Sequence, residues 1–104
     1  MTFGVMPSRE EFDRAFEEET KDGEFTITIP EHSASCEGFV AGLESANIDI
    51  TAEWISGQFG EPRMKWTFTA ATLWAMCSAF AHCGDEDLEG WASSCMDILG
   101  FEWI

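Results

Sequence analysis

Six residues near the start of the chain, from Glu24 to Ile29, alternate strictly between polar and apolar side chains. Phe25, Ile27 and Ile29 occupy the apolar positions. Side chains of a strand point alternately to its two faces, so this pattern predicts a strand with one buried face. Pro30 follows and ends the strand. Such a strand has to lie in a sheet whose apolar face is covered by other elements.

Helical periodicity precedes and follows this strand. A first helix is predicted after Ser8, which can form a capping box with Glu11, and Gly23 is expected to end it. Further helices are predicted at about 33–47, through Leu73 to near Gly84, and at about 87–100. The expected apolar stripes are Phe12, Ala15 and Phe16; Cys36, Phe39, Val40 and Leu43; Leu73, Met76, Cys77 and Phe80; and Leu88, Trp91, Ala92, Cys95 and Leu99.

Two more strands are predicted at 48–55 and 64–70, joined as a hairpin by a loop at 56–63 that is long enough to be mobile. Glu53 and Lys65 are expected on its solvent side. The residues expected on its buried side are Ile48, Ile50, Ala52, Trp54, Met64, Trp66 and Phe68.

The predicted fold is therefore α+β, with a small, largely antiparallel sheet of three to four strands and about four helices packed on it. The sequence contains no repeat, low-complexity segment or linker, so residues 1–104 are expected to form one compact domain. The apolar tail at 101–104 is expected to dock on the core or to add a short strand.

Small residues recur every fourth position in the predicted helix at 33–47, including Gly38 and Gly42. Each glycine costs a helix about 1 kcal/mol relative to alanine. A close backbone approach to a sheet or a neighbouring helix would explain both.

Charge is the strongest functional indication. Twenty Asp and Glu residues against five Lys and Arg give a formal net charge of −15, although 45% of the chain is hydrophobic. This excludes unaided electrostatic binding to nucleic acid or to an anionic membrane. With no export signal and no long apolar run, a cytoplasmic protein with free thiols is expected.

The acids gather in two segments, which are the predicted partner-binding residues. The segments consist of Glu10, Glu11, Asp13, Glu17, Glu18, Asp22 and Glu24, and of Asp85, Glu86, Asp87 and Glu89. Acidic runs usually form a solvated face, and a halophilic cytoplasm is another explanation. Solubility, however, needs a net charge of only about 2 to 8, and stronger self-repulsion destabilises a fold.

Cysteine and histidine residues suggest a zinc site or a thiol enzyme as competing hypotheses. The candidate side chains are Cys77, His82, Cys83 and Cys95, with His32 and Cys36 four residues apart. The sequence has no Cys-x-x-Cys pair, and no glycine-rich oxyanion turn surrounds any cysteine. Buried structural cysteines are the preferred interpretation, so no metal, no cofactor and no catalysis are predicted.

The alternating acids Asp85, Asp87 and Glu89 are similar to the start of a calcium loop, and Gly90 stands at its sixth position. Met96 occupies the twelfth position, where such a loop needs a closing glutamate. The negative charge that favours a helix N-terminus explains these acids more simply.

In size, charge and acidic segments, the chain resembles the small phage-encoded inhibitors known as anti-CRISPR proteins, several of which mimic DNA. The resemblance implies a non-catalytic inhibitor that blocks target DNA binding by a CRISPR effector complex. Carboxylates on successive helical turns lie roughly 5 to 6 Å apart, close to the spacing of phosphates along a strand. An immunity protein that neutralises a basic nuclease toxin is the alternative, and an apolar interface around Phe59 or the 101–104 tail is another.

Overall fold

The computed structural model describes residues 6–20, 22–31, 33–81 and 83–101. Within these ranges the elements are α1 (Arg9–Glu19), β1 (Phe25–Pro30), α2 (Ala34–Ser45), β2 (Glu53–Ser56), β3 (Pro62–Phe68), α3 (Ala70–Phe80) and α4 (Glu86–Ile98). This confirms the predicted α+β class and the small antiparallel sheet.

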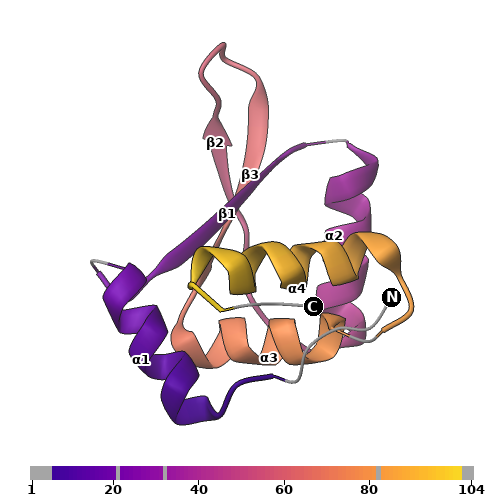
Figure 1. The fold of residues 1–104 in the computed structure, drawn as a ribbon. Coiled ribbons are helices and arrows are strands. Elements are labelled where there is room, and N and C mark those ends of the chain that lie inside the picture. The colour runs from indigo at the N-terminus through magenta and orange to yellow at the C-terminus, as the bar shows by residue number, and fades with distance from the viewer. Residues whose placement is uncertain (1–5, 21, 32, 82, 102–104) are drawn as a thin grey trace.

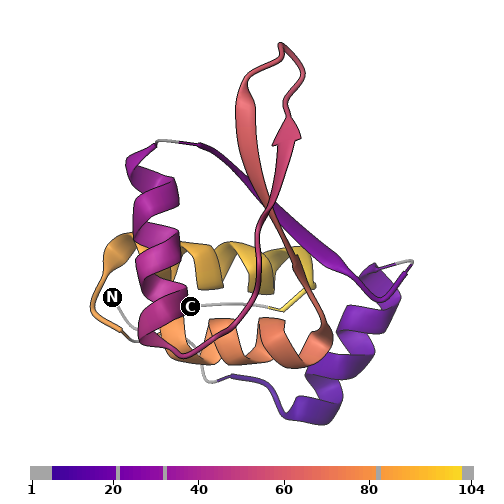
Figure 2. The ribbon, with the colours of Figure 1, turned by 180° about the vertical axis from the view of Figure 1, so that it is seen from behind.

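The sheet has the strand order β1-β3-β2, and both pairs are antiparallel. Phe25 lies opposite Phe68 in one pair, and Trp54 lies opposite Met64 in the other. β2 and β3 form a ribbon that extends beyond the helices (Figure 1). α3 and α4 lie side by side, whereas α1 and α2 lie at opposite ends of the molecule (Figures 1 and 2).

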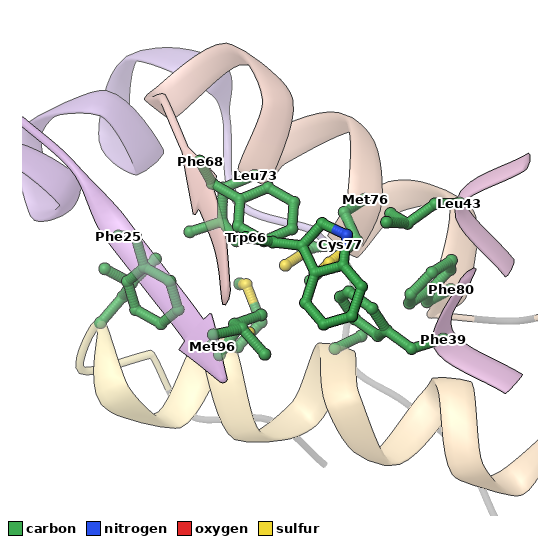
Figure 3. Packing of buried hydrophobic residues seen from close by; sticks show 14 of the residues in the cluster. Phe25, Phe39, Leu43, Trp66, Phe68, Leu73, Met76, Cys77, Phe80 and Met96 are labelled. Carbon is green, nitrogen blue, oxygen red and sulfur yellow. The ribbon is translucent and has the colours of Figure 1, made fainter. Parts of the chain in front are cut away.

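The core lies between the inner part of the sheet and the helices (Figure 3), and the fully buried Phe39 of α2 contacts four other aromatic rings of the described residues within it. The Phe39 ring makes edge-to-face contacts with Trp66 of β3 and Trp91 of α4, with ring centroids 4.9 and 5.2 Å apart. Near α1, the ring of Phe12 packs against Trp74 and Phe101. Residues 102–104 of the tail lie outside the described ranges.

The end of α1 differs from the prediction. The helix stops at Glu19, because the Thr20 backbone is extended and its hydroxyl donates to the Phe16 carbonyl at 2.6 Å. Gly23 does adopt a positive φ of 69°, but in the turn before β1. At the other end, the Glu11 N–H donates to the Ser8 hydroxyl, while the Glu11 carboxylate accepts from that hydroxyl rather than from the backbone.

The ends of α3 and β3 also differ from the prediction. β3 stops at Phe68 because Thr69 caps α3 in a capping box with Thr72. α3 ends at Phe80 rather than near Gly84. α4 ends as predicted, with Gly100 at a positive φ of 87°.

Two residues predicted to be buried are exposed. Trp54 is 59% exposed because β2 is an edge strand of the ribbon that extends past the helices, and Val40 on α2 is 36% exposed. β2 is also shorter than predicted, since only Glu53–Ser56 pair with β3. Ile50 and Ala52 are half-buried as expected, but they precede the strand.

The predicted close approach of this helix to its neighbours is found at Gly42. A Cβ added there would lie 2.9 Å from Leu88 Cδ2 and 3.0 Å from Phe80 Cζ, so a glycine lets α2 approach α3 and α4. The same expectation is wrong for Gly38, where an added Cβ would meet nothing within 4 Å.

Candidate acidic and apolar binding surfaces

The two acidic segments lie far apart. α1 and the N-terminus of α4 are at opposite ends of the molecule in both views (Figures 1 and 2). The longest dimension of the fold is 38 Å. The eleven predicted partner-binding residues therefore form two separate surfaces.

The acids at the start of α4 have a structural explanation. Asp85 is the N-cap, and its carboxylate accepts hydrogen bonds from the N–H groups of Asp87 and Leu88 at 3.0 and 3.3 Å. The Glu89 carboxylate accepts one from the Gly84 N–H at 3.0 Å. Glu86 and Asp87 are exposed in the first turn, where the helix dipole favours negative charge. Stabilisation of the helix accounts for this segment.

The acids of α1 form an exposed outer face. Glu10, Glu17 and Glu18 are exposed there, opposite the buried Phe12 and Phe16. Two arginines reduce the negative charge of this face. Arg9 forms an ion pair with Asp13 at 2.8 Å, and the exposed Arg14 lies one turn from both Glu10 and Glu18.

The last turn of α1 is electrostatically unfavourable. Glu17, Glu18 and Glu19 occupy the C-terminal end of the helix, which carries no basic residue in that turn. The negative end of the helix dipole disfavours each such charge by about 0.3 to 1 kcal/mol. Asp22 and Glu24 follow as exposed side chains before β1. We call the residues Glu10, Glu17, Glu18, Glu19, Asp22 and Glu24 the α1 acidic face.

Three of the four cysteines are buried, and Cys83 is exposed. A hydrogen bond with Cys95, together with burial, raises the pKa of Cys77 and keeps its thiol protonated at neutral pH. Burial, assisted by Glu31 and Glu37, raises the pKa of Cys36. Among the described residues, no three His, Cys, Asp or Glu side chains group as metal ligands, and His32 and His82 lie outside the described ranges.

A groove of about 570 Å³ lies between α2, the segment that precedes β2, and β3 at the base of the hairpin, and sequence reasoning missed it. We call it the hairpin groove. Its lining comprises Cys36, Val40, Ala41, Ile50, Ala52, Met64 and Trp66, with the carboxylates of Glu31, Glu37 and Glu44. The spacing of Glu37, Val40 and Glu44 places these three residues on one stripe of α2. This stripe is the one feature of the sequence that could have indicated the groove. The tip of the hairpin bears Phe59, which is 89% exposed.

Comparison with protein families, with curated proteins and with solved structures finds no match for this chain. None of the described helices has both the length and the apolar character needed to cross a membrane.

Proposed function

We propose that this chain is a non-catalytic acidic inhibitor whose α1 acidic face occupies a basic, nucleic-acid-binding surface of a partner protein. The observation that carries the proposal is the exposed run Glu17–Glu19 at the C-terminal end of α1. Negative charge at this end destabilises the helix. A contribution to binding explains why these residues are present, whereas helix stability does not.

The acids at the start of α4 are not part of the proposed binding surface. Asp85 and Glu89 hold the start of a helix through hydrogen bonds, and the segment lies at the opposite end of the molecule from α1. The proposed binding surface therefore retains the α1 acidic face and leaves out the acids at 85–89.

The partner class follows from charge. Lys and Arg side chains that bind a phosphate backbone also attract carboxylates spaced along a rigid helix. A CRISPR effector complex in a host-cell cytoplasm is the partner we test first, because of the resemblance to anti-CRISPR proteins. A basic nuclease toxin has the same electrostatic requirement and is the second partner.

The experiment measures binding to a purified guide-RNA effector complex and to a basic nuclease domain, each with and without competing DNA. A charge-reversed variant, E17K/E18K, is compared with E86K/D87K, which changes the net charge equally at the other end of the molecule. We expect DNA to compete with the wild-type chain, and affinity to fall steeply as salt rises.

The two variants separate the proposal from a general charge effect. E17K/E18K should lose at least about tenfold in affinity, since two favourable ion contacts become repulsive. It should also unfold at higher urea, because Lys is favoured at a helix C-terminus. E86K/D87K should retain affinity and lose stability. Equal losses of affinity in both variants, or binding that is indifferent to salt, would refute the proposal.

A further inference from the structure

The hairpin groove combines an apolar floor with an acidic rim. Met64, Ile50 and Ala52 are half-buried in its lining, and Val40 on the α2 wall is 36% exposed. Glu37 and Glu44 stand two turns apart on the same wall, about 10 Å along the helix axis. Glu31 contributes a third carboxylate.

Trp54 extends this apolar surface. It lies opposite Met64 in the antiparallel register, so the two side chains share one face of the hairpin. Its indole N–H donates to the carboxylate of Glu31, which also lines the groove. Among the described residues, the large hydrophobic side chains that are exposed are Val40, Trp54, Phe59 and Ile98. Two of these four, Val40 and Trp54, therefore lie at this groove. Exposed tryptophan is typical of binding surfaces.

We propose that the hairpin groove binds an extended or helical segment of a partner protein in which apolar side chains are interspersed with Lys or Arg. The apolar side chains would cover Val40, Ile50 and Met64, and the cations would reach Glu37 and Glu44. A volume of about 570 Å³ is sufficient for a few such side chains. This surface is chemically distinct from the α1 acidic face, and its α2 wall lies at the opposite end of the molecule from α1 (Figure 2).

The negative charge of the chain favours a cationic partner segment over a second copy of the chain as the occupant of the groove. Two copies would each bring a net charge of −15 to an interface that already carries three carboxylates. Like charges facing each other across an interface oppose association. A cationic amphipathic segment instead satisfies the apolar floor and the acidic rim together.

The test uses a synthetic peptide of alternating leucine and lysine, with a glycine–lysine peptide of equal length and charge as its control. Calorimetry at about 0.15 M salt measures both affinities, and salt at this concentration screens charges beyond about 8 Å. We expect the leucine–lysine peptide to bind at least about tenfold more tightly, because only it covers the apolar floor.

Matched variants locate the binding. V40A and E37Q/E44Q should each weaken binding by about three- to tenfold, through lost apolar contact and lost ion pairs. Their controls are I98A and E86Q/D87N, which alter an exposed aliphatic residue and two carboxylates outside both proposed binding surfaces, and which should change affinity by less than about twofold. All six positions are exposed, and circular dichroism verifies folding of each variant.

Three results would overturn the inference. Equal binding of the two peptides would show that charge alone is recognised. Equal weakening by E86Q/D87N and E37Q/E44Q would show that net charge, rather than the hairpin groove, determines binding. Sedimentation of the wild-type chain as a dimer that V40A dissociates would identify a second copy as the occupant. Each result is independent of the α1 proposal, which depends on the E17K/E18K variant.

Discussion

The indole Nε1 of Trp54 donates a hydrogen bond of 2.7 Å to the carboxylate Oε2 of Glu31. This bond joins the edge strand β2 to the residue that follows β1, across the central strand β3. The Glu31 N–H also donates to the Pro62 carbonyl at 3.1 Å, which prolongs the β1–β3 pairing by one residue. Glu31 thus connects both strands of the hairpin, β2 and β3, to the end of β1.

Removing the Trp54–Glu31 bond should loosen the hairpin without unfolding the core. We expect W54F to lower the free energy of unfolding by about 1 kcal/mol, the usual net contribution of such a bond. Urea unfolding of W54F, E31A and the double variant measures the coupling energy between the two side chains, since alanine leaves no acceptor for the indole N–H. Pairing W54F with E44A provides the control, for which the effects should be additive. Additive effects for W54F and E31A would contradict a significant bond.

The two glycines of α2 should respond oppositely to alanine. G38A should raise the free energy of unfolding by about 0.5 to 1 kcal/mol, since its Cβ meets nothing and alanine favours the helix. At Gly42 the same gain is opposed by contact with Leu88 and the buried Phe80 ring. Overpacking costs about 1 to 3 kcal/mol, so G42A should be less stable than the wild-type chain by about 1 kcal/mol. Thermal and urea unfolding of both variants measure this, and equal changes would contradict the packing at Gly42.

The type of each helix and strand could be predicted because periodicity is a local property. Phe25, Ile27 and Ile29 are all buried, as their alternation requires. The same alternation places Trp54 on the face that bears Met64, and that is correct. It cannot indicate how far the helices cover that face, which depends on the relative lengths of distant elements. Trp54 is exposed for this reason. Helical periodicity likewise cannot indicate whether another element covers Val40 on α2.

The candidate sites were less predictable for the same reason. The acids of α1 and those at 85–89 are alike in sequence, yet the path of α4 starts at the other end of the molecule. The hairpin groove combines α2, residues 50–52 and β3, and no local pattern reveals that these segments meet. Only the stripe of Glu37, Val40 and Glu44 on α2 was visible in advance.

The hairpin tip should depend on pH through Glu61. Its carboxylate accepts hydrogen bonds from its own N–H and from the Phe59 N–H at 2.9 Å, and these lower its pKa, with a smaller effect of Arg63. A lowered folded-state pKa means that this stabilisation is present above the ordinary value of about 4.3 and is lost as pH falls through the folded value.

The Phe59 amide is the reporter for this titration. Its NMR chemical shift should change with a midpoint below about 4.3, the ordinary pKa of glutamate. In E61Q the residue cannot titrate, so that transition should disappear. A midpoint at or above the ordinary value would contradict the bond between Glu61 and the Phe59 N–H.

The cysteines should differ in reactivity according to burial. Cys83 is exposed, whereas the raised pKa values of Cys36 and Cys77 disfavour the reactive thiolate. A disulfide reagent should modify one thiol quickly in the native chain and all four after denaturation. C83S should abolish the fast phase. A second fast thiol in C83S, or an unusually fast one at Cys83, would favour the thiol-enzyme hypothesis over an inhibitor.

Arg14 offers the sharpest test of the α1 acidic face, because its effects on affinity and stability should have opposite signs. It lies one turn from Glu10 and Glu18, so R14Q removes the attraction between a positive charge and two carboxylates, worth about 0.2 to 0.5 kcal/mol each at this helical spacing. The variant should therefore be slightly less stable to urea. The same change removes a positive charge from the surface that is proposed to meet Lys and Arg of a partner. Affinity should rise by about two- to fivefold, the effect of one exposed charge.

K65Q is the matched control for R14Q, because it removes one positive charge from the hairpin instead of from α1. It should leave affinity for the partner unchanged. If R14Q binds no better than the wild-type chain, α1 does not face the partner. If K65Q improves affinity equally, net charge rather than the α1 acidic face drives association.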